Sequence, residues 1–111
     1  ISFFPRAWWR LTSNLETYGG VLFAFSEVSQ IDPKNSRLAG GVNRNSFDAS
    51  PGGYLGTEYD VGIRFTPTLG ALNLNVGAEF GHFIFGDAFN SADRSTPSPI
   101  NAARFYVRST L

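Results

Sequence analysis

An unbroken alternation of residue types from Tyr54 to Thr66 constrains the fold of this chain more than any other feature of its sequence. One face of this stretch carries Leu55, Thr57, Tyr59, Val61, Ile63 and Phe65, and the other carries Gly56, Glu58, Asp60, Gly62 and Arg64. A period of two is typical of a β-strand, because a helix with 3.6 residues per turn would scatter both sets around its axis. The stretch is therefore predicted to be a strand with one apolar and one polar face.

The same alternation recurs along the rest of the chain. It is clear over residues 72–80 and 103–111, shorter over residues 6–11, and weaker over residues 19–28, where Val21, Phe23 and Phe25 form the apolar face. No segment shows a helical period. We therefore predict an all-β chain with antiparallel strands near residues 4–12, 19–28, 54–66, 72–85 and 100–111, in up-and-down order and with no helix longer than a turn or two.

The lengths of the strands and of their connections favour a transmembrane barrel. Soluble strands usually have about 5–6 residues, whereas a tilted strand that crosses a membrane needs about 9–11. The predicted connections alternate between short turns at residues 13–17 and 67–71 and long loops at residues 29–52 and 86–98. Outer-membrane barrels have short periplasmic turns and long extracellular loops in this order. A soluble β-sandwich has the same alternation of faces, so the period alone fits both classes.

Composition excludes several other classes of protein. Nine basic and nine acidic residues cancel, which argues against a nucleic-acid-binding protein. The chain contains no Cys, so disulfide bonds and thiolate metal sites are excluded. No apolar run approaches the roughly 18 residues of a membrane-spanning helix. Because the chain begins at Ile1 and contains no Met, we expect it to be a piece of a longer protein.

Two motifs stand out in the second half of the chain. Residues 55–61 read L-G-T-E-Y-D-V, and residues 77–89 read G-A-E-F-G-H-F-I-F-G-D-A-F. They resemble the C-terminal part of the alginate-export family of Gram-negative outer-membrane β-barrels. The last strands of that family similarly carry an L-G-x-E-x-D-hydrophobic strand and, further along, G-x-x-x-G-H/Y-F-x-x-G-D. The resemblance covers residues 54–111.

This resemblance implies a porin-like channel in the outer membrane of a Gram-negative bacterium. A monomeric barrel of about eighteen strands would transport an anionic polysaccharide or another small anionic or polar solute, without a cofactor. Even the smallest single-chain barrels need about eight strands, so residues 1–111 are predicted to be a single partial segment of about five C-terminal strands. The expected partners are therefore outer-membrane lipid and the remaining strands or other chains that close the barrel.

Eight charged residues are predicted to line the pore, because they fall on the polar faces of the predicted strands. They are Arg6, Arg10, Glu58, Asp60, Arg64, Glu79, Arg104 and Arg108. An Arg side chain that faced lipid near the membrane midplane would cost about 2–4 kcal/mol, so the lumen is the expected side. Two roles fit these residues. The arginines attract anions and bind carboxylates through paired hydrogen bonds, or they form ion pairs with neighbouring carboxylates that brace the wall.

The sequence shows no catalytic, cofactor-binding or metal-binding constellation, so we predict that the protein is not an enzyme. His82 is the only His, and the alternation places it beside Ile84 on the apolar face, near a membrane interface. The nearest approach to a Ca²⁺ site is Asp32 with Asp48 in the long loop. Aromatic residues fit a girdle at the two interfaces or, alternatively, a platform for stacking carbohydrate. They are Trp8, Trp9, Tyr18, Tyr54, Tyr59, Phe83, Phe85 and Phe105.

Two functional hypotheses from different classes follow from these features. The first is a passive transport barrel. The second is a structural or adhesive β-protein that transports nothing and binds a partner through the loop at residues 29–52, either as a soluble sandwich or as a membrane barrel. Dependence on detergent separates the soluble form from the membrane form, because a barrel wall that faces lipid leaves a broad apolar face uncovered in water.

Overall fold

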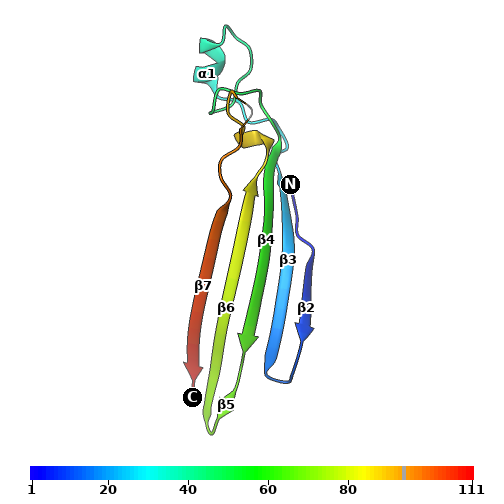
Figure 1. Cartoon of the computed structure of the whole chain (residues 1–111), viewed down its shortest axis with the longest axis vertical. Helices are drawn as coiled ribbons and strands as arrows, with labels where there is room; N and C mark the ends of the chain where they lie inside the picture. Colours follow the sequence, from blue (N-terminus) through cyan, green and yellow to red (C-terminus); the bar gives the residue numbers. More distant parts are fainter. Residues whose placement is uncertain (94) are drawn as a thin grey trace. The chain divides into compact units, whose positions relative to one another are not determined.

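The computed structural model describes residues 1–93 and 95–111, and its long strands form one antiparallel sheet (Figure 1). The strands are β1 (Ser2–Phe3), β2 (Arg6–Arg10), β3 (Leu15–Phe25), β4 (Tyr54–Phe65), β5 (Thr68–Leu69), β6 (Leu72–Phe85) and β7 (Ile100–Thr110). Two short helices complete the description, α1 (Pro33–Leu38) and the 3-10 turn η1 (Asp87–Phe89). The prediction of an all-β chain without a long helix is therefore confirmed. Neither helix in the described part of the chain is long and apolar enough to cross a membrane.

Neighbouring strands in the sheet follow the order of the chain. Both β1 and β2 pair with β3, β3 pairs with β4, β4 pairs with β6, and β6 pairs with β5 and β7. This is the predicted up-and-down order. Within the described residues β2 and β7 each have one neighbouring strand, so the sheet has two edges and does not close into a barrel.

The chain divides into two compact units, which are described separately. The strand unit comprises residues 4–21, 59–82 and 101–111. The loop unit comprises residues 1–3, 22–58 and 83–100, and it contains both helices. Strands β3, β4, β6 and β7 contribute residues to both units.

In the strand unit, exposure alternates along β4 as the sequence pattern predicts. Val61 and Ile63 are 53% and 44% exposed, whereas Gly62 between them is buried and Arg64 is half-buried. On β7, Phe105 and Val107 are 81% and 71% exposed, and Tyr106 between them is the one half-buried residue of the strand. At these positions the apolar side chains are therefore uncovered, and the residues between them on the polar face are more buried.

The first predicted strand and turn differ from the structure at their boundaries. Residues 4–12 were expected to form one strand, but β2 begins only at Arg6, because Pro5 has no N–H to donate to β3. The Pro5 carbonyl still accepts a hydrogen bond of 3.1 Å from the N–H of Val21. The turn expected at residues 13–17 lies at residues 11–14, since Arg10 pairs with Glu16 and the ladder extends β3 back to Leu15.

The second predicted turn, at residues 67–71, is tighter than expected. Strand β5 pairs Thr68 with Asn73 and Leu69 with Leu72, so only Gly70 and Ala71 reverse the chain. Gly70 has a φ of 62°, which Gly adopts without steric cost. A two-residue hairpin loop of this kind requires a positive φ.

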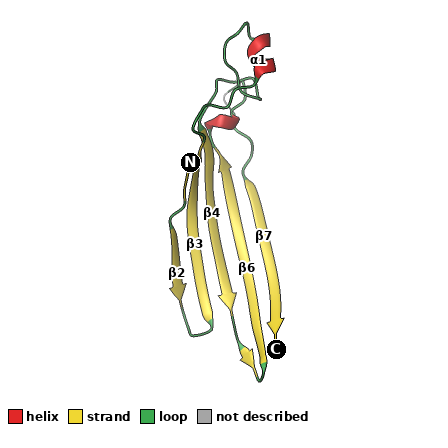
Figure 2. Cartoon of the chain, turned by 180° about the vertical axis from the view of Figure 1, so that it is seen from behind, coloured by secondary structure: helices red, strands yellow, loops and turns green. Residues whose placement is uncertain are grey.

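The loop unit contains both predicted long loops and a one-turn helix that the periodicity did not reveal (Figure 2). Asp32 caps α1 by accepting a hydrogen bond of 2.9 Å from the N–H of Asn35. Pro33 occupies the first turn, where its missing N–H costs nothing. Asp-Pro is thus a helix start here, within a stretch that the sequence predicts as a long loop at residues 29–52.

Candidate functional site

All charged residues of the strand unit lie on the polar face of its strands. They are Arg6, Arg10, Glu16, Asp60, Arg64, Glu79, Arg104 and Arg108. Five arginines against three carboxylates give this face a net charge of +2. The loop unit has the opposite balance, with four basic and six acidic residues and a net charge of −2. Positive charge is therefore concentrated on one face of the strands, although the whole chain is neutral.

Two tyrosines lie flat across glycines of the neighbouring strand on this face. The ring of Tyr18 on β3 occupies the space above Gly62 on β4, and a Cβ atom at Gly62 would collide with it. Tyr106 on β7 covers Gly77 on β6 in the same way. Because each glycine has no side chain, the tyrosine ring passes over its strand, and the hydroxyl reaches the next strand of the sheet.

Tyr18 uses this reach to bind a carboxylate two strands away. Its hydroxyl donates a hydrogen bond of 2.5 Å to Oε1 of Glu79 on β6. The other carboxylate oxygen, Oε2, lies 2.7 Å from Nη2 of Arg104 on β7. Both oxygens of Glu79 are therefore engaged, and the ion pair with Arg104 joins two adjacent strands.

Tyr106 forms the second cluster, in which positive charge dominates. Its hydroxyl accepts a long hydrogen bond of 3.4 Å from Nε of Arg64 on β4. The guanidinium groups of Arg104 and Arg108 each lie 5.4 Å from the centre of its ring, within the range of cation–π attraction. Arg64 also lies 5.6 Å from the ring of Tyr18, so both tyrosines contact the same arginine.

The other predicted pore-lining residues lie outside these two clusters. Arg6 lies over the rings of Phe4 and Trp8, at 5.1 and 5.4 Å from their centres. Arg10 forms an ion pair of 3.7 Å with Glu16 across β2 and β3, and the Arg10 side chain is largely exposed. Asp60 and Glu58 are half-buried on β4. Glu58 belongs to the loop unit.

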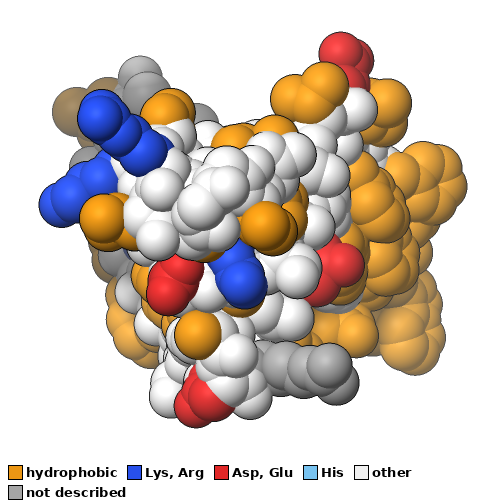
Figure 3. All heavy atoms as spheres, turned by 90° about the horizontal axis from the view of Figure 1, so that it is seen from above, with side chains coloured by type: hydrophobic (Ala, Val, Ile, Leu, Met, Phe, Trp, Pro, Cys, Tyr) orange, Lys and Arg blue, Asp and Glu red, His pale blue; other side chains and the backbone are white. Residues whose placement is uncertain are grey.

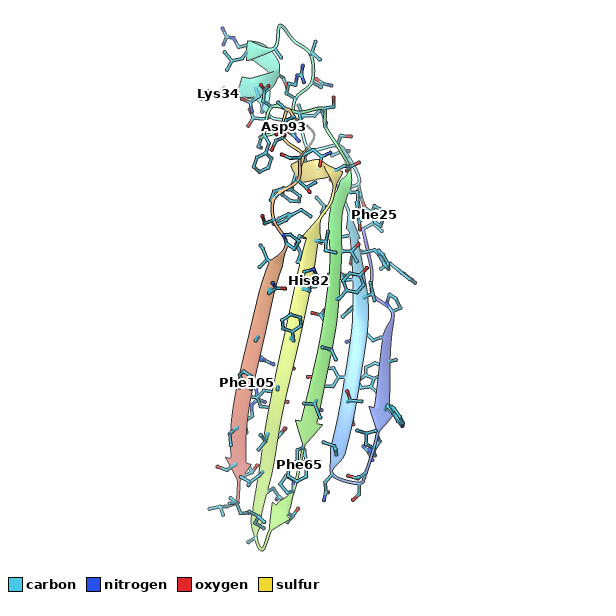
Figure 4. All side chains as sticks on the ribbon, in the orientation of Figure 1. Phe25, Lys34, Phe65, His82, Asp93 and Phe105 are labelled. Carbon is cyan, nitrogen blue, oxygen red and sulfur yellow. The ribbon has the colours of Figure 1, made fainter. Side chains whose placement is uncertain are left out.

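His82 lies on β6, between Gly81 and Phe83 (Figure 4). Its Nδ1 lies 2.5 Å from Oδ1 of Asn101 on β7. Asp32, one of the two acids named as the nearest approach to a Ca²⁺ site, accepts the capping hydrogen bond at the start of α1. In the described part of the chain, no three His, Asp or Glu side chains are grouped so that they could hold a metal ion.

In the loop unit, one asparagine ties the two long loops together. Asn45 is 1% exposed, and its Nδ2 donates to the carbonyls of Ala88 and Asn90 at 3.3 and 2.9 Å. Its Oδ1 accepts from the N–H groups of Phe47 and Ala49, both at 2.9 Å. The loop before β4 and the loop after β6 are therefore linked through a fully bonded side chain.

Further contacts fix the loops near the ends of their strands. The carboxylate of Asp87 accepts a hydrogen bond of 3.0 Å from the N–H of Tyr54, where β4 begins. The hydroxyl of Ser95 donates to Asp93 at 2.6 Å and lowers the pKa of that exposed carboxyl. In the view from above, hydrophobic side chains gather along the right-hand side, and Lys and Arg side chains lie at the left and in the middle (Figure 3).

The sequence predicts seven of the eight charged residues on the polar face of the strand unit, but neither Glu16 nor the residues that organise these charges. Tyr18 was grouped with the interfacial aromatics, whereas its hydroxyl binds Glu79. Gly62 falls on the predicted polar face and Gly77 lies within the alternating stretch at residues 72–80, but the sequence assigns neither of them a role. A signal was present, since a glycine among charged residues on a packed face leaves room for a neighbouring ring.

Comparisons with known proteins identify no relative. No protein-family model matches the sequence, no curated protein is similar to it, and no solved structure matches the fold. The function must therefore be argued from the geometry of the two faces.

Proposed function

We propose that this chain forms part of the wall of an outer-membrane β-barrel channel in a Gram-negative bacterium, with residues 1–111 as one partial barrel segment. The single observation that carries the proposal is the separation of the faces in the strand unit. Every charged residue lies on one face, and large apolar side chains stand exposed on the other. Such a sheet suits a wall between lipid and water.

The lengths of the strands support a membrane location. Strands β3, β4, β6 and β7 have 11, 12, 14 and 11 residues. Each reaches the roughly 9–11 residues that a tilted membrane-spanning strand needs. The apolar face would contact outer-membrane lipid, and the two sheet edges would pair with further strands of the same protein or of another chain.

The excess of positive charge on the polar face supports passage of anionic or polar solutes, among them an anionic polysaccharide. Low-dielectric walls strengthen the field of charges that line a pore, so +2 on this face would concentrate anions near it. The transport is passive and needs neither catalytic chemistry nor a cofactor.

Ion selectivity of the complete protein in planar bilayers tests the proposal. The double variant Arg104→Glu with Arg108→Glu should lower the permeability of anions relative to cations, because it reverses two charges on the polar face. The matched control is Lys34→Glu with Arg37→Glu in α1, which makes the same change in charge outside the strand unit and should shift selectivity less. Unchanged ion preference in a folded, conducting double variant would show that these arginines only brace the wall.

A second candidate function is adhesion through the loop unit. Asn45 ties the long loop to the loop after β6, and the long loop exposes Leu38 and Val42, which are 77% and 59% exposed. An ordered loop with exposed apolar side chains suits a partner-binding surface. Deletion of residues 33–42 would abolish partner binding and leave conductance intact if adhesion is the function.

A further inference from the structure

The arginines of the strand unit differ in how far their charge is already neutralised. Arg104 donates to Oε2 of Glu79 at 2.7 Å, and Arg10 is paired with Glu16. Within the described residues of this unit, these are the two ion pairs, and neither includes Arg64 or Arg108. Both oxygens of Glu79 already have direct partners, the Tyr18 hydroxyl and Arg104, so Arg64 and Arg108 form no direct contact with this carboxylate in the described residues.

Arg64 and Arg108 are brought together by Tyr106. Nε of Arg64 donates to the Tyr106 hydroxyl, and the guanidinium of Arg108 lies over the Tyr106 ring. The two side chains come from β4 and β7, which are separated by β6. Tyr106 can bridge this gap because Gly77 on β6 has no side chain beneath its ring.

Arg64, Tyr106 and Arg108 keep hydrogen-bond donors that their contacts with one another do not occupy. A guanidinium has five N–H donors, and Arg64 spends one of them on a hydrogen bond of 3.4 Å. The Tyr106 oxygen is the acceptor in that bond, so its own O–H stays available as a donor. Two cations and a hydroxyl therefore present donors at one place on the polar face.

We infer that Arg64, Tyr106 and Arg108 form a binding site for an oxyanion, namely a carboxylate, sulfate or phosphate group. Guanidinium groups bind such anions through paired, charge-assisted hydrogen bonds. A chloride ion is a single atom and does not offer the two acceptor oxygens that a paired guanidinium bond needs, so the site should prefer oxyanions. The inference rests on the proposed function only in that a solute in the pore would carry the group to this site.

Sulfate binding to the complete protein in a neutral detergent, free of anionic lipid, tests the site. Calorimetric titration with sodium sulfate, against sodium chloride at equal ionic strength, should show saturable binding of sulfate. Arg64→Gln and Arg108→Gln should each weaken sulfate binding at least tenfold, and Tyr106→Phe should weaken it by less. Arg37→Gln in α1 removes the same charge outside the strand unit and should bind sulfate as the unmodified protein does.

The outcomes separate this inference from the channel proposal. Far-UV circular dichroism first establishes that each variant keeps its β-structure, and Arg108 is exposed, so its replacement should not prevent folding. Equal sulfate affinity in the Arg64→Gln, Arg108→Gln and unmodified proteins would overturn the site, whether or not the protein conducts ions. Sulfate binding that depends on both arginines in a protein without conductance would support the site and overturn the channel.

Discussion

The contact between Tyr106 and Gly77 shows how one missing side chain organises the polar face at the scale of residues. Tyr106 lies across β6 only because Gly77 has no Cβ to displace its ring. Replacement by Ala would force the ring outward and loosen its contacts with Arg64, Arg104 and Arg108. The same holds for Tyr18 above Gly62, so the two glycines determine where the tyrosine hydroxyls end.

We expect Gly77→Ala to lower the free energy of unfolding by about 1–3 kcal/mol, the usual cost of overpacking. Urea unfolding of the complete protein in detergent measures this change. Gly53→Ala is the matched control, because its added Cβ would lie at an ordinary 3.6 Å from the carbonyl oxygen of Ser26. In a Tyr106→Ala background the cost of Gly77→Ala should vanish. If the cost persists there, the ring is not its cause.

Asn45 offers a second prediction at the same scale. Asn45→Ala leaves two buried N–H groups and two carbonyls without their partner, which should cost about 1–3 kcal/mol. The two loops should then separate, and cleavage of residues 26–53 by a protease should become at least tenfold faster. Asn43→Ala, at an exposed position two residues earlier, should leave the cleavage rate unchanged. Equal cleavage rates in both variants would show that Asn45 does not tie the loops together.

At the scale of elements, the strands could be predicted because their signal is local. The alternation over residues 54–66 and 72–85 predicted β4 and β6 to within one residue at each end. The predicted boundaries of β2 and β3 were wrong, because these boundaries depend on which residue of one strand pairs with which residue of the other. The contact between Tyr18 and Glu79 depends on pairing in the same way, since the two residues lie 61 positions apart in the chain.

The two faces of β4 lead to a prediction for single cysteines. Asp60 and Val61 are adjacent, and their side chains point to opposite faces of the strand. If the proposed membrane location is right, a water-soluble thiol reagent should label Asp60→Cys and not Val61→Cys in the complete protein reconstituted into lipid vesicles. The pair Glu79→Cys and Phe80→Cys on β6 should behave in the same way. Labelling of position 61 but not 60 would reverse the assignment of lipid and lumen.

At the scale of the whole molecule, the uncovered apolar surface is the property that most needs an explanation. Ala49 and Ala88 are the apolar residues found buried in the described part of the chain. A soluble domain of this length would bury well over half of the surface that its unfolded chain exposes. Here large side chains such as Phe105, at 81% exposed, have no cover from this chain.

This exposure predicts how the complete protein behaves with and without detergent. In water alone the apolar faces would associate, because each exposed Leu, Ile or Phe side chain gains about 1.5–3 kcal/mol when it is removed from water. The two sheet edges would add backbone hydrogen bonds between molecules. Gel filtration should therefore show aggregates without detergent and one discrete species in detergent, with circular dichroism reporting β-structure for that species.

The substitutions Val61→Ser and Phe105→Ser test whether the exposed apolar side chains cause the aggregation. They should reduce aggregation in water without altering the polar face. A monomeric, β-rich protein in water alone would contradict the membrane assignment and favour a soluble sandwich, in which another part of the protein covers the apolar face.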